Sequence, residues 1–80
     1  MTYKLSEDSQ LAWLLNELRT ARDLKLLKSD WTQLSDSPLS EQKKTEWANY
    51  RQQLRDLPAS VNGLNEDRTI TVNWPTEPTD

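Results

Sequence analysis

The sequence predicts a mainly α protein, an antiparallel hairpin of two helices over about residues 7–28 and 40–57, joined by a packed loop. An extended segment, over about residues 69–74, is expected to follow the second helix. Three observations lead to this fold class. Leucines recur every three or four residues in the first half, a Ser cap and an aromatic seam define the second helix, and a β-branched run alternates near the C-terminus. With 80 residues, the chain has room for one domain.

The first helix is predicted from its leucines. Ser6 or Asp8 is the expected N-cap, while Lys25 and Lys28 suit the negative end of the helix dipole. The apolar residues at steps of three and four form one expected stripe, which consists of Leu11, Leu14, Leu15, Leu18, Ala21, Leu24 and Leu27. Trp13 and Leu26 fall outside this stripe, which indicates a second contact surface on the helix.

The connection over residues 29–39 contains turn and cap residues in place of helical periodicity. Asp30 is expected to close the first helix or to cap a turn through its side chain. Trp31 and Leu34 lie three residues apart in this loop. Because the loop exceeds the usual length of about 2–8 residues between helices, both side chains are expected to fold back and anchor it.

The second helix follows Pro38, with Ser40 as its expected N-cap, and it ends before Pro58. Its apolar residues recur at steps of three, four and three, a narrow seam that suits packing against the first helix. These seam residues are Trp47, Tyr50, Leu54 and Leu57. The connection is short compared with either helix, so the two helices are expected to lie antiparallel.

Two arginines flank this seam. Arg51 and Arg55 lie one turn apart, and their heads are expected to reach a loop carboxylate such as Asp30 or Asp36. Surface pairs of this kind contribute below about 1 kcal/mol, so the expected role is to position the loop. Phosphate binding is the alternative, and the net charge of −3 argues against it.

The chain after Pro58 is predicted to form a turn and then an extended segment. Asn62-Gly63 is a turn signal, and residues 69–74 alternate with β-branched side chains. A single strand cannot pair with itself. The segment is therefore expected to lie along the helices, to pair with another chain, or to form a small hairpin with residues 61–65. Pro75 and Pro78 end regular structure, and a flexible tail is expected after them.

Composition argues against several classes of function. The chain has no Cys and no His, so no disulfide and no thiolate or imidazole metal site is expected. Asp30 and Asp36 could bind a hard cation, but they lack the spaced acids, central Gly and terminal Glu of a calcium loop, so neither a metal nor a cofactor is expected. The net charge of −3, without a run of basic residues, argues against a nucleic-acid partner. The polar N-terminus and the lack of an apolar stretch near ~20 residues argue against a signal peptide and a membrane span. No arrangement of acids, nucleophile or Gly-rich loop supports catalysis, so neither an enzyme nor catalytic residues are expected.

The large side chains are the remaining candidates for function, because Trp is concentrated in binding hot spots. The mean hydropathy of −0.94 predicts a fold of low stability that depends on a partner or on self-association. The candidate interface residues are Trp13, Trp31, Leu34, Arg51, Arg55, Ile70, Val72, Trp74 and Pro75. For the aromatic residues, a place in the core is the alternative interpretation. The residues by themselves support a small helical binding module.

Several motifs together resemble the phage tail assembly chaperone family. They are Arg22-Asp23 with Leu26-Leu27, then Ser29-Asp30-Trp31-Thr32-Gln33-Leu34, then Asp36-Ser37-Pro38-Leu39, then Glu46 through Pro58, and finally Trp74-Pro75. The resemblance covers about residues 18–78, which it implies to be one chaperone-like helical domain. Residues 1–17, which include the N-terminal part of the first helix, lie outside it. The family supplies no catalytic residues.

The resemblance implies a protein that helps a tail-fibre protein to fold, trimerise or attach. The expected partner is a trimeric fibre protein, contacted toward its distal end, and the expected location is the host bacterial cytoplasm during assembly. The alternative is a permanent structural subunit of the fibre or baseplate, retained on the virion tail, because both functions need the same interface. A small enzyme or lysis factor is a third class, for which these residues supply no polar site.

Overall fold

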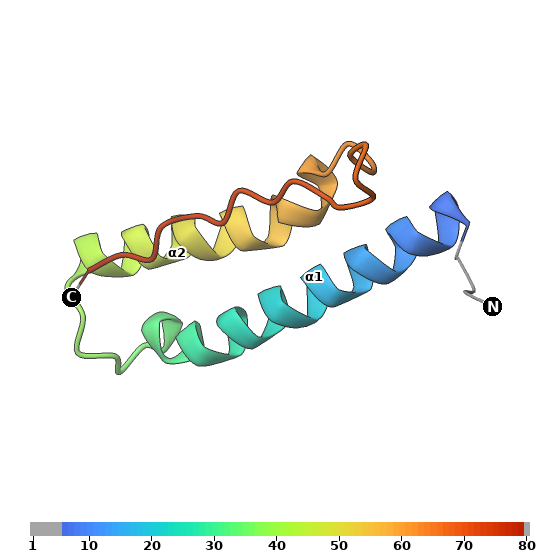
Figure 1. The fold of residues 1–80 in the computed structure, drawn as a ribbon. Helices are drawn as coiled ribbons and strands as arrows, with labels where there is room; N and C mark the ends of the chain where they lie inside the picture. Colours follow the sequence, from blue (N-terminus) through green and yellow to red (C-terminus); the bar gives the residue numbers. More distant parts are fainter. Residues whose placement is uncertain (1–5, 80) are drawn as a thin grey trace.

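The computed structural model describes residues 6–79 as two helices, each followed by a short 3-10 helix (Figure 1). The helix α1 spans Glu7–Ser29 and is followed by η1, Asp30–Gln33. The helix α2 spans Glu41–Asp56 and is followed by η2, Leu57–Ser60. The two long helices run antiparallel beside each other (Figure 1), so the predicted helical hairpin is confirmed.

Both long helices begin with a serine cap. The Ser6 hydroxyl accepts a hydrogen bond from the Ser9 backbone N–H, and the Ser40 hydroxyl accepts one from Lys43, each over 3.2 Å. Each bond satisfies one of the N–H groups that the first turn of a helix leaves without a partner. Of the two caps considered for the first helix, the structure uses Ser6.

The core lies where α2 faces α1. Its buried apolar residues are Leu18, Trp47, Tyr50, Leu54 and Leu57. Leu54 is completely buried, and the rings of Trp47 and Tyr50 meet edge to face with centroids 5.7 Å apart. The predicted seam of the second helix is therefore confirmed at each of its positions.

The predicted stripe of the first helix is wrong in its C-terminal half. Leu18 is buried, whereas Leu24 and Leu27 are 52 % and 67 % exposed. The cause is the spacing, because each step of three residues falls about 60° short of a full turn of an α-helix. Three such steps from Leu18 place Leu27 about half a turn away from the core. Leu26, which lies outside the predicted stripe, packs against the buried cluster around Trp47 instead.

The connection between the helices is anchored by one aromatic contact and by polar groups. Trp31 meets Trp47 with ring centroids 6.2 Å apart. Thr32 is completely buried and donates its hydroxyl hydrogen to the Ser29 carbonyl over 2.6 Å. Leu34 remains 55 % exposed, so the expectation that it folds back over the helices is wrong. The loop does not need this side chain, because Thr32 and the Trp31 ring already hold it.

A turn after η2 reverses the chain. Gly63 has a φ of 131°, a conformation that favours glycine, and Arg68 has a φ of 67°. The Asn65 N–H donates to the Thr69 carbonyl over 2.7 Å, and the Arg68 N–H donates to the Asn65 carbonyl over 2.9 Å. The turn signal at Asn62-Gly63 thus marks the start of a longer reversal.

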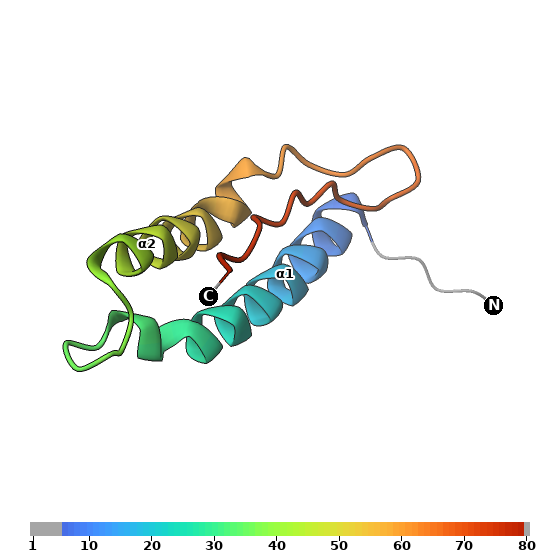
Figure 2. The same ribbon diagram turned by 90° about the vertical axis from the view of Figure 1, so that its left-hand side faces the viewer.

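The C-terminal segment then returns along the helices, as Figures 1 and 2 show. Ile70 and Val72 are half-buried and alternate with the exposed Thr71 and Asn73. No strand forms within residues 6–79. The side chains that alternate along this segment therefore face the helices or the solvent, and the segment joins no sheet. Of the three placements considered for this segment, the structure shows the one along the helices.

Candidate binding surface

Arg51 joins α2 to the C-terminal end of α1. Its guanidinium donates hydrogen bonds to the Leu26 carbonyl, the Ser29 hydroxyl and the Asp30 carboxylate, each over 2.7 Å. The predicted contact with a loop carboxylate is therefore confirmed for Asp30. Arg51 is only 8 % exposed, and these three bonds hold α1, the loop and α2 together.

Arg55 takes a different position. Its side chain is exposed and donates to the Gln52 side-chain oxygen over 3.5 Å. Within residues 6–79 it makes no ion pair with Asp30 or Asp36, so the expected contact with the loop is wrong for this arginine. Asp30 is already bound by Arg51, which lies one turn nearer to it along α2.

An unusual share of the large apolar side chains faces solvent. Six of them are at least 40 % exposed, and they are Trp13, Leu24, Leu27, Trp31, Leu34 and Trp74. Five apolar residues are buried in the described chain, so the exposed set outnumbers the core. Where such side chains gather on one face they mark contact sites for other molecules, whereas single ones are ordinary on a protein surface.

Three of these side chains share one face of α1. Trp13 and Leu24 are eleven residues apart, so their directions around the helix axis differ by about 20°. The direction of Leu27 differs from that of Leu24 by about 60°. All three point at least about 120° around the helix from Leu18, which faces α2. We call Trp13, Leu24 and Leu27 the outer stripe. Of the two residues expected on a second contact surface, Trp13 is exposed on the outer stripe and Leu26 packs against the core. Contact of the outer stripe with another molecule stays a prediction.

The predicted interface residues fall into separate environments. Those that are largely exposed are Trp13, Trp31, Leu34, Arg55 and Trp74. Those that are half-buried against the helices are Ile70, Val72 and Pro75, and Arg51 lies within the hairpin. The Trp74 ring is not free of contacts, since the Lys25 ammonium lies 5.1 Å from its centroid in a cation–π arrangement. An interface role for these residues stays a prediction.

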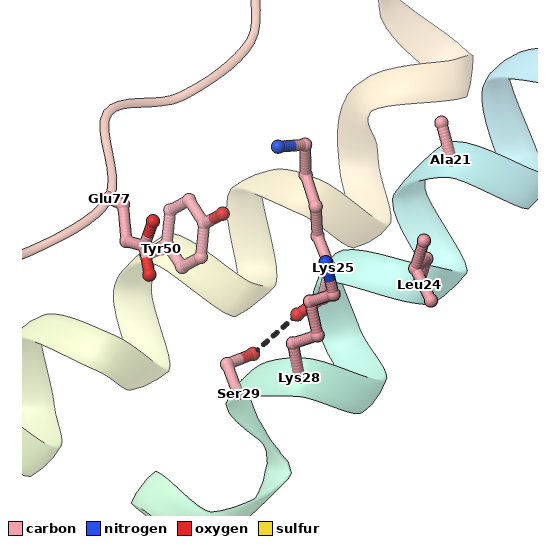
Figure 3. Close-up of a pocket in the computed structure, with 7 residues that line it drawn as sticks. All are labelled: Ala21, Leu24, Lys25, Lys28, Ser29, Tyr50 and Glu77. Atoms are coloured by element: carbon pink, nitrogen blue, oxygen red, sulfur yellow. Dashed lines mark hydrogen bonds between the residues drawn. The ribbon is translucent and has the colours of Figure 1, made fainter.

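A pocket of about 310 Å³ opens between α1, α2 and the C-terminal segment (Figure 3). It is lined by Ala21, Leu24, Lys25, Lys28, Ser29, Tyr50 and Glu77. Tyr50 from α2 and Glu77 from the C-terminal segment lie opposite the side chains of α1 (Figure 3). Sequence reasoning missed this site. The one available signal was a pair of lysines three residues apart on one helix of an acidic chain.

The pocket alters the acid–base behaviour of Tyr50. Burial raises the pKa of its phenol above the usual 10.0, and the negative charge of Glu77 raises it further. As pH rises past 10.0, the unfolded phenol ionises first, so the free energy of unfolding falls above that pH. Below pH 10 both states keep the proton, and Tyr50 adds no pH dependence.

We therefore expect Glu77→Gln to lower the pKa of Tyr50 without returning it fully to 10.0, because burial is the larger cause. The measurement is the tyrosinate absorbance during a titration. Tyr3 lies outside the described residues, and a Tyr3→Phe background makes Tyr50 the single tyrosine observed. An unchanged titration curve after Glu77→Gln would show that the carboxylate does not act on the phenol.

A comparison with protein families bears on what this surface does. The model of the family described as phage tail assembly chaperone protein matches residues 15–79. The chain belongs to this family. No curated protein and no solved structure matches it. The resemblance seen in the sequence motifs is thus confirmed.

As a tail assembly chaperone, the chain acts on a phage tail protein, and its family points to a role without catalysis. All of the exposed large apolar residues except Trp13 lie within the matched region. Within residues 6–79 no group of acidic side chains is arranged to hold a metal ion. No helix in this part of the chain is long and apolar enough to cross a membrane.

Proposed function

We propose that this tail assembly chaperone binds a phage tail-fibre protein and assists its folding, trimerisation or attachment. The observation that carries the proposal is the set of six large apolar side chains that are at least 40 % exposed within residues 6–79, three of which share one face of α1. A small protein that keeps such a surface uncovered gains from a partner that covers it. The partner is the trimeric fibre protein, bound toward its distal end in the cytoplasm of the host during assembly.

Binding protects the fibre chain while it is still incomplete. Fibre subunits that have not yet trimerised expose apolar surface and strand edges, both of which promote aggregation. The outer stripe offers apolar side chains that can cover the exposed apolar surface of the fibre chain. Residues 69–74 are already extended, with Thr71 and Asn73 facing outward, and this conformation suits pairing with a strand edge through the main chain.

Co-expression with the fibre protein of the same phage tests the proposal. We expect the intact chaperone to raise the yield of soluble fibre trimer, and Leu24→Ser with Leu27→Ser to abolish most of that gain. These two side chains are exposed, so the substitutions leave the core unchanged. Arg19→Ser with Gln42→Ser is the matched control, because both residues are exposed helix positions away from the outer stripe. Equal yields with and without the chaperone would contradict the proposal.

The composition of purified virions separates the chaperone from a permanent structural subunit. We expect the protein to be absent from mature particles or far below the amount of fibre protein. A stoichiometric amount on the virion tail would assign it instead to the fibre or baseplate.

A further inference from the structure

We propose that the pocket between α1, Tyr50 and Glu77 is a docking site for an acidic and apolar segment of the tail protein. We call it the lysine pocket, after Lys25 and Lys28 in its wall. This inference rests on the proposed function, because the segment belongs to the fibre partner. It adds the chemical character of what is bound and the groups that recognise it.

The apolar part of the recognition comes from the walls and rim. Ala21 and Leu24 line the pocket from α1, and Leu24 is 52 % exposed. Trp74 lies near them through its contact with Lys25, and this residue is 40 % exposed. A volume of about 310 Å³ is at the lower end of ligand pockets, so the site suits a few side chains of a peptide.

The charged part comes from two lysines whose charges are not neutralised within the described chain. Lys43 and Lys44 pair with Glu46 and Glu41, but neither Lys25 nor Lys28 forms an ion pair within residues 6–79. The Lys25 ammonium lies 5.1 Å from the Trp74 ring centroid, at the rim of the pocket. Two such cations in one pocket favour an acidic group at close range, because opposite charges attract. The net charge of −3, spread over the whole chain, opposes this attraction but is screened by salt beyond about 8–10 Å.

Glu77 already places one carboxylate in the wall of this pocket. Its charge acts on Tyr50, and yet it forms no ion pair with Lys25 or Lys28. It belongs to the C-terminal segment, whose end is held by a hydrogen bond from the Lys43 ammonium to the Thr79 carbonyl. An acidic ligand must therefore approach the lysines against the repulsion of Glu77. The proposal therefore predicts two opposite changes in the affinity for acidic peptides. Removal of the lysine charges should weaken binding, and removal of the Glu77 charge should strengthen it.

The experiment uses short overlapping peptides that cover the fibre protein of the phage encoding this chain. Their affinity for the full-length chaperone is measured by fluorescence anisotropy. We expect the bound peptides to combine Asp or Glu with Leu, Phe or another large apolar residue, and to bind more weakly as salt rises. Lys25→Glu with Lys28→Glu should weaken binding by about tenfold or more, whereas Glu77→Gln should strengthen it by about twofold to fivefold.

The matched control is Arg19→Glu with Arg55→Glu, which changes the net charge by the same amount at exposed positions outside the pocket. Its affinity should stay within about twofold of the parent chain. Charge reversal near the end of α1 also opposes the helix dipole, so Lys25→Gln with Lys28→Gln provides a gentler variant, with a loss of about threefold to tenfold. Circular dichroism confirms that each variant is folded.

Peptides that are neutral or basic, or a Lys25→Glu, Lys28→Glu chain that behaves as the arginine control does, would overturn the inference. A Glu77→Gln chain that binds acidic peptides more weakly would also overturn it, as would binding of free inorganic phosphate with the same affinity as the peptides. The gain in soluble trimer with the intact chaperone is measured separately from these peptide affinities, although Leu24 belongs both to the outer stripe and to the pocket wall. If the lysine variants still raise the yield of soluble trimer, the proposed docking site is contradicted and the proposed chaperone function is kept.

Discussion

Replacing Arg51 with Ala is expected to lower the free energy of unfolding by about 2–4 kcal/mol. The substitution removes three hydrogen bonds of 2.7 Å and leaves the Ser29 hydroxyl without its donor. The Leu26 carbonyl still accepts the longer bond of 3.2 Å from the Ser29 hydroxyl. Ser29 is only 4 % exposed, so water replaces the lost donor poorly. The Asp30 side chain is 56 % exposed, which is why the expected loss is below that of a fully buried ion pair.

Urea unfolding followed by circular dichroism measures this loss, with two variants for comparison. Arg55→Ala truncates an exposed arginine one turn farther along α2 and should change the free energy of unfolding by less than about 0.5 kcal/mol. Asp30→Asn keeps the bonds of Arg51 to α1 and should cost below about 1 kcal/mol. If Arg51→Ala and Arg55→Ala were equally stable, the bonds at the end of α1 would not hold the hairpin.

A domain of this size has a total stability of only about 4–12 kcal/mol. Loss of Arg51 therefore takes away a large share of it. The sequence predicted the contact with Asp30 but assigned it to the surface. The error has a physical reason, because the burial of Arg51 depends on the end of α1 closing over it. The sequence of the second helix alone cannot predict that the end of α1 covers Arg51.

The predictions that succeeded depend on local rules. Ser40 caps α2 through its own side chain, and the seam that includes Trp47 and Leu54 follows the period of one helix. The prediction for α1 failed at Leu24 and Leu27, where residues spaced by three drift away from the core face. A strict count of 3.6 residues per turn would have placed these leucines outside.

The pocket could not be predicted, because its residues come from three separate segments. Lys25 and Tyr50 lie on different helices, and Glu77 arrives only when the C-terminal segment returns along both of them. The sequence left three placements open for that segment, since alternating β-branched residues suit any apolar surface with a period of two. Contact with the helices buries Ile70 and Val72 in part without a second strand.

Leu54→Ala is expected to lower the free energy of unfolding by about 2–5 kcal/mol. Leu54 is completely buried beside Trp47 and Tyr50, so the shorter side chain leaves a cavity at the centre of the hairpin. Residues 6–79 include five buried apolar residues, so few neighbours are available to fill that space. The measurement is again urea unfolding, and the expected midpoint lies well below that of the parent chain.

Leu24→Ala is the matched comparison, since the same three carbon atoms are removed from a side chain that is 52 % exposed. It should change the free energy of unfolding by less than about 0.5 kcal/mol and still reduce the gain in soluble fibre trimer. Equal losses of stability in both variants would mean that the outer stripe is packed in the free protein. A stable Leu24→Ala chain with weakened fibre assembly would instead assign the two sets of leucines to different tasks, the inner one to the hairpin and the outer one to the partner.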